Sequence, residues 1–314
     1  MKIIKSHYLS LTLFAFTFLF ACNKSPIIEK QTRISKELNL IMLKVGDLHN
    51  KGLNKFSSEK SNLIKNLKKL EKENKNRISN NTVFKNNSTQ EGVIEELLEE
   101  TRTYFIQYTH TNLPEITFPN SIFDSLSFLP TEYYINPNNL SSNYIVETSP
   151  IILSPLFEEL VGQLIVISSN ANSINEFNSQ ADEILISADN YLTSDTEFFA
   201  IAMGIAIGKS SFAYWNTQEN VDYWNSILAT YSSDSIQQNE IRSNYQFEFN
   251  DDIKAMATAD LAGAIRGGIM GGTVGSIGGP AGTFSGAVGG AFYTGLRSST
   301  LAGAWRVAKK YFNW

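Results

Sequence analysis

Apolar residues recur along much of the chain at spacings of three and four, which places them on one face of an α-helix. The first stripe consists of Ile34, Leu38, Ile41, Val45 and Leu48. It is followed by Asn50 and Gly52, residue types that commonly end helices, so we expect the first helix to end there. A second stripe covers residues 63–70, and a third runs from about Val93 to Tyr108. The sequence therefore predicts three helices before residue 111.

Helix starts in the second half of the chain are marked by N-capping residues. Ser154 precedes Pro155, and proline is favoured in the first turn of a helix. Ser173 and Ser194 each begin the S-x-x-E pattern of a capping box. The helix after Ser194 is apolar on nearly all sides, so we expect it to be the central buried helix.

Glycines recur at every fourth position in two runs near the C-terminus. The first run is Gly263, Gly267, Gly271, Gly275 and Gly279, and the second is Gly278, Gly282, Gly286 and Gly290. Pro280 lies at the junction, where we expect the chain to reverse. A four-residue interval places each run along one helix face, so the absence of side chains lets two helices approach closely. The pattern predicts a helical hairpin over 261–296 in which eight glycines pack the helices together: Gly263, Gly267, Gly271, Gly275, Gly279, Gly282, Gly286 and Gly290.

Such a hairpin needs a partner, because interior glycine destabilises a helix. Each costs ~1 kcal/mol relative to alanine, so the glycines of 261–279 cost an isolated helix on the order of 8 kcal/mol. We favour a tightly packed hairpin within or against protein; membrane association and a Gly-rich loop stay open. No charged residue occurs from Gly267 to Leu296, but at ~1.5 Å per residue the two helices reach only about 28 and 24 Å, near or below a ~30 Å hydrocarbon core.

The hairpin pattern resembles the glycine-zipper segments of envelope lipoproteins and of pore-forming bacteriocins. This resemblance implies that 261–296 packs with itself, with a protein partner or with the bilayer. The segment VGDLHNKGL, residues 45–53, is similar to one that recurs in uncharacterised exported proteins of Bacteroidetes-type bacteria, which implies no activity. After the hairpin, we expect an amphipathic helix over 297–314 that docks on the core or lies at a lipid interface.

The N-terminus has the pattern of an export signal. Lys2 and Lys5 precede an uncharged, Leu- and Phe-rich run over residues 8–20, which is too short to span a membrane as a helix. The run ends in LFAC, which resembles the lipobox of bacterial lipoproteins. The resemblance implies that residues 1–21 are removed and that Cys22 is lipidated and anchors the protein in a membrane. Asn23 rather than Asp follows, which implies the outer rather than the inner membrane; a free thiol after an ordinary secretory signal is the alternative.

Composition narrows the remaining function classes. Loss of Lys2 and Lys5 with the signal changes the formal net charge from −5 to −7, and an acidic chain argues against non-specific nucleic-acid binding. Cys22 is the only cysteine, which excludes an intramolecular disulfide framework and a multi-cysteine metal site. We expect no nucleic-acid partner and no cofactor.

Candidate catalytic patterns are weak. We interpret His49 and His110 as surface or capping residues. The segment 204–210, GIAIGKS, is one residue short of a phosphate-binding loop and lies inside a helical pattern, so we reject it; segment 282–286, GTFSG, has the wrong spacing for a nucleophile elbow. The acidic run Glu95, Glu96, Glu99 and Glu100 is typical of a solvated helix face. We therefore expect no catalytic residue, no metal ligand and no small-molecule substrate.

These patterns predict an all-α protein: a helical bundle with a long irregular central loop and a C-terminal Gly-rich hairpin. The expected order is signal peptide 1–21, tether 22–33, N-terminal helical region 34–110, irregular Pro-, Asn- and Ser-rich segment 111–150, helical core 151–260, hairpin 261–296 and amphipathic helix 297–314. The function expected is that of a membrane-anchored cell-envelope lipoprotein without enzymatic activity. The alternative is a membrane-active, toxin-like exported factor.

Overall fold

The computed structural model describes residues 32–59, 87–114, 149–220 and 251–312, together with residues 116, 123, 126, 145 and 222. These residues form α-helices and no strands, which confirms the all-α class. The chain divides into two units, Met1–Arg33 and Ile34–Trp314, and every helix below belongs to the second. The lipobox, the stripe at residues 63–70 and most of the segment 111–150 lie outside the described residues.

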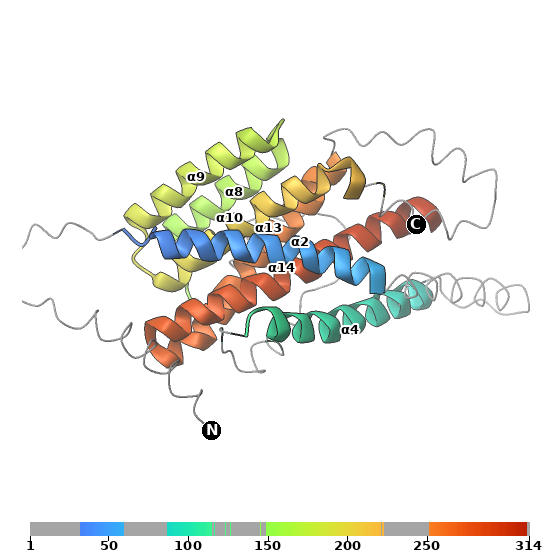
Figure 1. The fold of residues 1–314 in the computed structure, drawn as a ribbon, viewed down its shortest axis with the longest axis horizontal. Helices are drawn as coiled ribbons and strands as arrows, with labels where there is room; N and C mark the ends of the chain where they lie inside the picture. The colour runs from blue at the N-terminus through green and yellow to red at the C-terminus, as the bar shows by residue number, and fades with distance from the viewer. Residues whose placement is uncertain are drawn as a thin grey trace, which may run out of the picture. The chain divides into compact units, whose positions relative to one another are not determined.

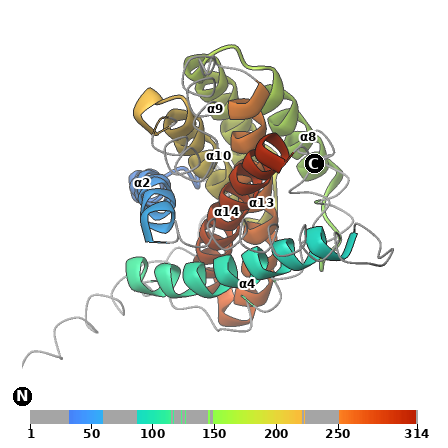
Figure 2. The ribbon, with the colours of Figure 1, turned by 90° about the vertical axis from the view of Figure 1, so that its right-hand side faces the viewer.

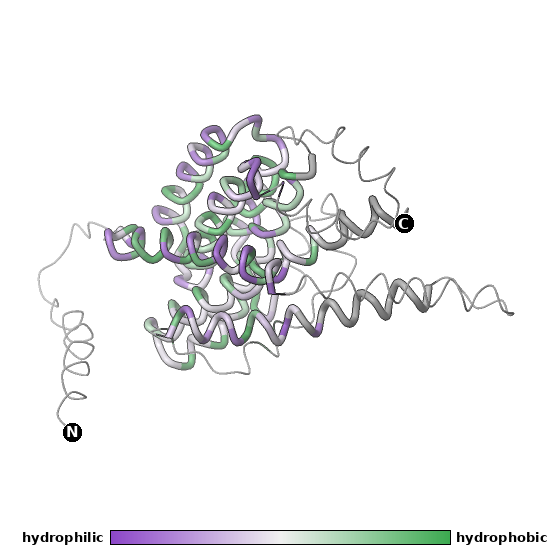
Figure 3. Tube along the Cα trace, turned by 45° about the vertical axis from the view of Figure 1, so that its right-hand side comes forward, coloured by the Kyte–Doolittle hydropathy of each residue, from purple (hydrophilic) through white to green (hydrophobic). Residues whose placement is uncertain are grey.

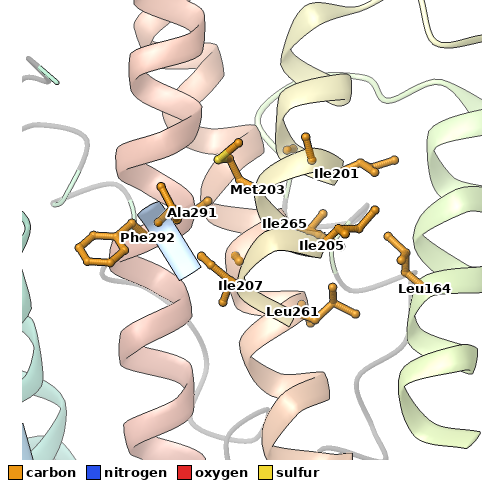
Figure 4. Packing of buried hydrophobic residues seen from close by; sticks show 14 of the residues in the cluster. Leu164, Ile201, Met203, Ile205, Ile207, Leu261, Ile265, Ala291 and Phe292 are labelled. Atoms are coloured by element: carbon orange, nitrogen blue, oxygen red, sulfur yellow. The ribbon is translucent and has the colours of Figure 1, made fainter. Parts of the chain in front are cut away.

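Helix α10 (Asp195–Trp215) lies at the centre of the core, as its apolar sequence predicts (Figure 1). Most of its residues are buried, and its isoleucines point toward helices on several sides. Figure 4 shows Ile201, Ile205 and Ile207 among buried apolar side chains of the neighbouring helices. A helix with apolar residues on all sides has no polar face to expose to solvent, so it is buried at the centre.

Helices α13 (Asp251–Gly275) and α14 (Gly279–Phe312) form a hairpin through the short 3₁₀ turn Ser276–Gly278. Figure 2 shows this hairpin beside α10, with α2, α4, α8 and α9 around them. The expectation of a separate helix over 297–314 is wrong, because α14 continues without a break to Phe312. No proline or glycine interrupts residues 296–302, and all of them are buried against the core.

Helices α8 (Pro155–Asn170) and α9 (Ile174–Tyr191) pack beside the hairpin and α10. The three predicted N-caps are confirmed. The side chains of Ser154, Ser173 and Ser194 each accept a hydrogen bond from the backbone N–H three residues later. Each bond satisfies one of the donors that a helix start leaves unpaired.

Helices α2 (Lys36–Glu59) and α4 (Asn87–Asn112) lie across the hairpin. The expected end of the first helix at Asn50 and Gly52 is wrong, because α2 continues to Glu59. Gly52 serves close packing instead, since a Cβ there would lie 2.7 Å from Leu296 Cδ2 and 2.9 Å from Tyr108 Cε1. The outer helices alternate between hydrophilic and hydrophobic residues along their length, as Figure 3 shows, because one face of each covers the core.

Candidate functional site: glycine ladders and a buried polar cluster

The glycines of the hairpin bring two backbones into direct contact. Gly267, Gly271 and Gly275 of α13 face Gly290, Gly286 and Gly282 of α14, and we call these six residues the glycine ladders. A Cβ on Gly271 would lie 2.0 Å from the Gly286 carbonyl oxygen, and the reverse distance is also 2.0 Å. Real Cβ atoms essentially never approach another heavy atom within 3.0 Å. Any larger residue at these positions must therefore push the helices apart.

One end of the ladders is closed by hydroxyl side chains. A Cβ on Gly263 would lie 2.2 Å from Ser298 Oγ, so this glycine makes room for a serine rather than for another glycine. The Thr294 hydroxyl lies 2.7 Å from the carbonyl oxygens of both Gly263 and Gly290. Because Gly263 is on α13 and Thr294 on α14, this hydroxyl links the two helices.

Gly279 takes no part in this packing, contrary to the expectation from the four-residue interval. No atom lies within 4 Å of a Cβ built there, and its backbone has φ 75° and ψ −165°. This conformation is accessible essentially to glycine alone. The helical register ends at Gly275, so Gly279 forms the turn that reverses the chain before Pro280.

A second set of close contacts joins α10 to the outer face of α13. A Cβ on Gly204 would lie 2.3 Å from Ile265 Cγ1, and one on Gly268 would lie 2.8 Å from Ala200 Cα. The sequence analysis did not single out these glycines, because they do not form a regular ladder. The hairpin is thus packed closely on both sides by its own chain.

A buried polar cluster lies where α2, α10, α13 and α14 meet, and we define it as His49, Ser211, Trp215, Asp260 and Ser299. Ser211 Oγ donates to Asp260 Oδ2, and His49 Nε2 lies 3.6 Å from the same oxygen. Trp215 Nε1 donates to Ser299 Oγ at 3.3 Å. The side chains of His49 and Asp260 are fully buried. The cluster therefore joins four helices through polar groups that water does not reach.

Burial governs the protonation of this cluster. Desolvation raises the pKa of Asp260 well above its ordinary value, against the opposing effect of hydrogen bonds from Ser211, Ser299 and Trp215. Desolvation also lowers the pKa of His49 to about 4, against hydrogen bonds to Asn50 and to the Gly295 carbonyl. These directions favour a neutral imidazole facing a protonated carboxyl group.

The neutral pair has a consistent hydrogen-bond arrangement. His49 Nδ1 lies 3.1 Å from Asn50 Oδ1, so an Nδ1–H can donate to that oxygen and leave Nε2 as an acceptor. In this tautomer Nδ1–H is the single donor of the ring, so it is also the group that would interact with the Gly295 carbonyl. Nε2 then faces Asp260, whose acidic proton it can accept after a small shortening of the 3.6 Å separation. A bond formed in this way would join α2 to α13 without a charge on either group.

Serine, histidine and aspartate also form the triad of serine hydrolases, but the arrangement here differs. A triad requires the histidine to contact the serine, with the aspartate behind the histidine. Ser211 instead contacts Asp260, and all three side chains are buried. The arrangement therefore differs from a triad, and the Ser211 hydroxyl is buried away from solvent.

The sequence analysis missed this cluster, and the interpretation of His49 as a surface or capping residue is wrong. His49 lies four residues after Val45 and four before Leu53, both fully buried, so it belongs to the buried face of α2. The four-residue spacing of His49 from Val45 and Leu53 is the sequence feature that indicates its buried position. Nothing in the local sequence indicated Asp260 as its neighbour, because the two lie on different helices.

The other candidates stand apart from this cluster. His110 is exposed, and its ring centroid lies 5.2 Å from that of Phe123. Glu99 is exposed and lies 3.5 Å from Arg102, while the side chains of the other three glutamates of that run are outside the described part. Within that described part, no three His, Cys, Asp or Glu side chains come together in a group that could hold a metal ion.

The remaining sequence candidates lie within helices or outside the described residues. The segment 204–210 is inside α10 and the segment 282–286 is inside α14, so the backbone N–H groups of both are used in helices. Among the described helices, α10 alone is long and apolar enough to cross a membrane, and 78% of its apolar window is buried in the core. Cys22 is not among the described residues. No family model, curated protein or solved structure matches the chain.

Proposed function

We propose that the chain is a lipoprotein of the cell envelope, without enzymatic activity, whose helical body is held at a membrane by acylated Cys22. The observation that carries this proposal is the sequence LFAC at residues 19–22, which ends an export-signal pattern at the chain's only cysteine. Attachment through two or more acyl chains is lasting, whereas a single chain binds only marginally.

The close packing of the hairpin supports a structural role for 261–296 inside this body. Gly271 and Gly286 contact each other within the chain, and α10 covers the outer face of α13 at Gly204 and Gly268. The faces of α13 that carry these glycines are thus already occupied by helices of the same chain. Association with a partner or with the bilayer is therefore expected at surfaces other than the ladders.

The absence of enzymatic activity is proposed from the chemistry of the buried polar cluster. Ser211 donates to Asp260 rather than to His49, and both titratable groups are closed to solvent, with burial shifting the pKa of each toward its neutral form. Nucleophilic or general-base catalysis needs an accessible group next to a base. The cluster instead provides a polar connection between helices.

Fractionation of cells that express the full chain tests the anchor. Wild type should be acylated at Cys22 and remain with membranes after a high-salt wash, whereas Cys22→Ala should lose the acyl group and leave the membrane fraction. Lys24→Ala, two residues away, keeps the lipobox and should behave as wild type. A Cys22→Ala chain that stays in washed membranes, or a wild-type Cys22 with a free thiol, would contradict the proposal.

A membrane-active, toxin-like role is a second candidate. It is favoured by the length and apolar composition of α10, which could cross a membrane if the body opened. The test is leakage of an encapsulated dye from phosphatidylcholine vesicles on addition of the chain lacking its first 21 residues. Leakage would support the toxin-like role, and intact vesicles would discard it.

A further inference from the structure

Large apolar side chains that remain exposed identify a surface. Among the described residues they are Leu40, Leu43, Ile152, Val166, Ile186, Tyr191 and Ile277. Ile152 and Ile277 are the most exposed, at 100% and 92%. Single exposed apolar residues are ordinary, so their positions relative to one another decide whether they carry information.

Three of these residues gather around the first turn of α10. The backbone N–H of Ser154 donates to Glu197 Oε1 at 2.7 Å, which places Ile152 beside that turn. Tyr191 ends α9 four residues before α10 begins. On the hairpin, Thr196 Cγ2 lies 3.0 Å from a Cβ built on Gly272, and Ile277 follows in the turn just beyond. We call Ile152, Tyr191 and Ile277 the tip end.

Helix α2 begins at the same end of the body. The Asn50 side chain donates to the Ser210 carbonyl at 3.0 Å, and Tyr214 donates to Asn54 Oδ1 at 2.7 Å, so α2 and α10 run in parallel. The start of α2 at Lys36 is therefore near the start of α10. Figures 1 and 3 show both the hairpin turn and the start of α2 toward the left. Leu40, exposed on the first turns of α2, lies on this side as well.

The chain that leads to the anchor enters here. Ile34 packs against the core just before α2, and twelve Cα–Cα steps lead to it from Cys22. Fully extended, they span at most about 43 Å. Whatever path they take, an acylated Cys22 thus keeps the start of α2 within this distance of its bilayer.

The chemistry of the tip end suits a lipid interface. The turn Ser276–Gly278 is uncharged, and no charged residue occurs between Gly267 and Leu296. Isoleucine partitions into the apolar side of an interface, and tyrosine is enriched at the headgroup level. The exposed charged side chains near this end are of both signs and include Lys36, Glu37 and Asp195, so we expect the contact to depend mainly on apolar burial.

We infer that the tip end rests on the bilayer that holds the Cys22 anchor, with Ile277 entering the lipid interface. This inference rests on the lipoprotein proposal and adds an orientation of the body. A second protein copy would need an interface of roughly 1,000 Å² for stable association. Separate apolar residues around a narrow turn do not provide such an area. For a lipid surface they suffice, because the anchor already supplies a high effective concentration.

Site-specific fluorescence can test the orientation, because acylation consumes the only native thiol. Ile277→Cys in the full acylated chain gives one labelling site at the tip end. Val166→Cys is the matched control, since Val166 is also exposed and lies on α8 about 17 Å along the helix from Pro155. Each variant carries an environment-sensitive fluorophore in phosphatidylcholine vesicles, some of whose lipids bear a headgroup nitroxide.

The inference predicts blue-shifted emission and loss of fluorescence by nitroxide quenching at position 277, and neither effect at position 166. Addition of the anionic lipid phosphatidylglycerol should leave this difference in emission and quenching between positions 277 and 166 unchanged. Equal, water-like emission from both labels on an acylated, vesicle-bound chain would overturn the orientation while leaving the anchor proposal intact. Unquenched label at 277 with 277–277 crosslinks between chains would assign the tip end to a second copy and also overturn it. A chain without acylation by mass spectrometry would overturn both proposals.

Discussion

Gly271 and Gly286 face each other so closely that a Cβ on either would lie 2.0 Å from the carbonyl oxygen of the other. The neighbouring pairs Gly267–Gly290 and Gly275–Gly282 repeat this relationship with distances of 2.1 to 2.2 Å to the facing carbonyl oxygens. Glycine is a poor helix former, so its use at these positions costs helix stability. The cost is offset by backbone contact that no other residue permits.

Gly271→Ala should therefore destabilise the protein even though alanine is the better helix former. Separation of the backbones would outweigh the ~1 kcal/mol gain in helix propensity, and we expect a net loss of about 1–3 kcal/mol in the free energy of unfolding. The double variant Gly271→Leu/Gly286→Leu should disrupt the hairpin. Chemical denaturation followed by circular dichroism measures both.

Gly278→Ala is the matched control for this prediction. Gly278 lies in the same hairpin, but no atom lies within 4 Å of a Cβ built there. Its free energy of unfolding should stay within about 0.5 kcal/mol of wild type, as is usual for surface substitutions. A Gly271→Ala protein as stable as Gly278→Ala would show that the helices can separate freely.

Glu197 connects two helix starts, and its loss should destabilise both. Its two carboxylate oxygens accept hydrogen bonds from the backbone N–H and the hydroxyl of Ser154, at 2.7 and 2.8 Å. Glu197 is buried, so Glu197→Ala should lower the free energy of unfolding by about 3 kcal/mol, the value of one or two bonds to a charged group. Glu159→Ala, at an exposed position of α8, should change it little. Equal stabilities of the two variants would contradict this role.

The sequence predicted the helices best where local signals define them. Ser154, Ser173 and Ser194 marked helix starts because a cap acts within one turn. Local signals failed at Gly52, where a residue type that often stops helices instead admits Leu296 and Tyr108 from distant segments. The four-residue glycine interval likewise led to the wrong prediction that Gly279 packs the two helices together. The interval alone does not show where the chain turns.

The buried polar cluster could be predicted only in part. The spacing of His49 from Val45 and Leu53 indicates a buried position on α2. Its contact with Asp260 depends on how α2 and α13 pack, and one sequence does not specify this pairing. A buried histidine and a buried aspartate are each costly alone, so their meeting is a property of the tertiary fold.

Asp260 should make stability decline as pH rises. Its pKa is raised in the folded protein, so its favourable contribution is complete below the unfolded value of 3.8 and is lost as pH rises toward its folded value. Asp260→Asn keeps the shape of the side chain but cannot ionise. The free energy of unfolding of this variant, relative to wild type, should therefore increase from pH 4 upward. An unchanged or decreasing difference would indicate an ionised Asp260 in the folded protein.

His49 should have the opposite pH dependence. Its pKa falls from 6.5 to about 4 on folding, so its contribution is complete above pH 6.5 and is lost as pH falls through 4. The resulting change in the free energy of unfolding is on the order of 3 kcal/mol. Asp260 contributes a pH dependence of opposite sign over part of this range. The free energy of unfolding of wild type must therefore be compared with that of His49→Gln, by denaturant unfolding between pH 3 and pH 8. The excess free energy of unfolding of wild type over His49→Gln should shrink as pH falls below 6.5. If the advantage of wild type grew on acidification, His49 would be protonated in the folded protein and paired with an ionised Asp260.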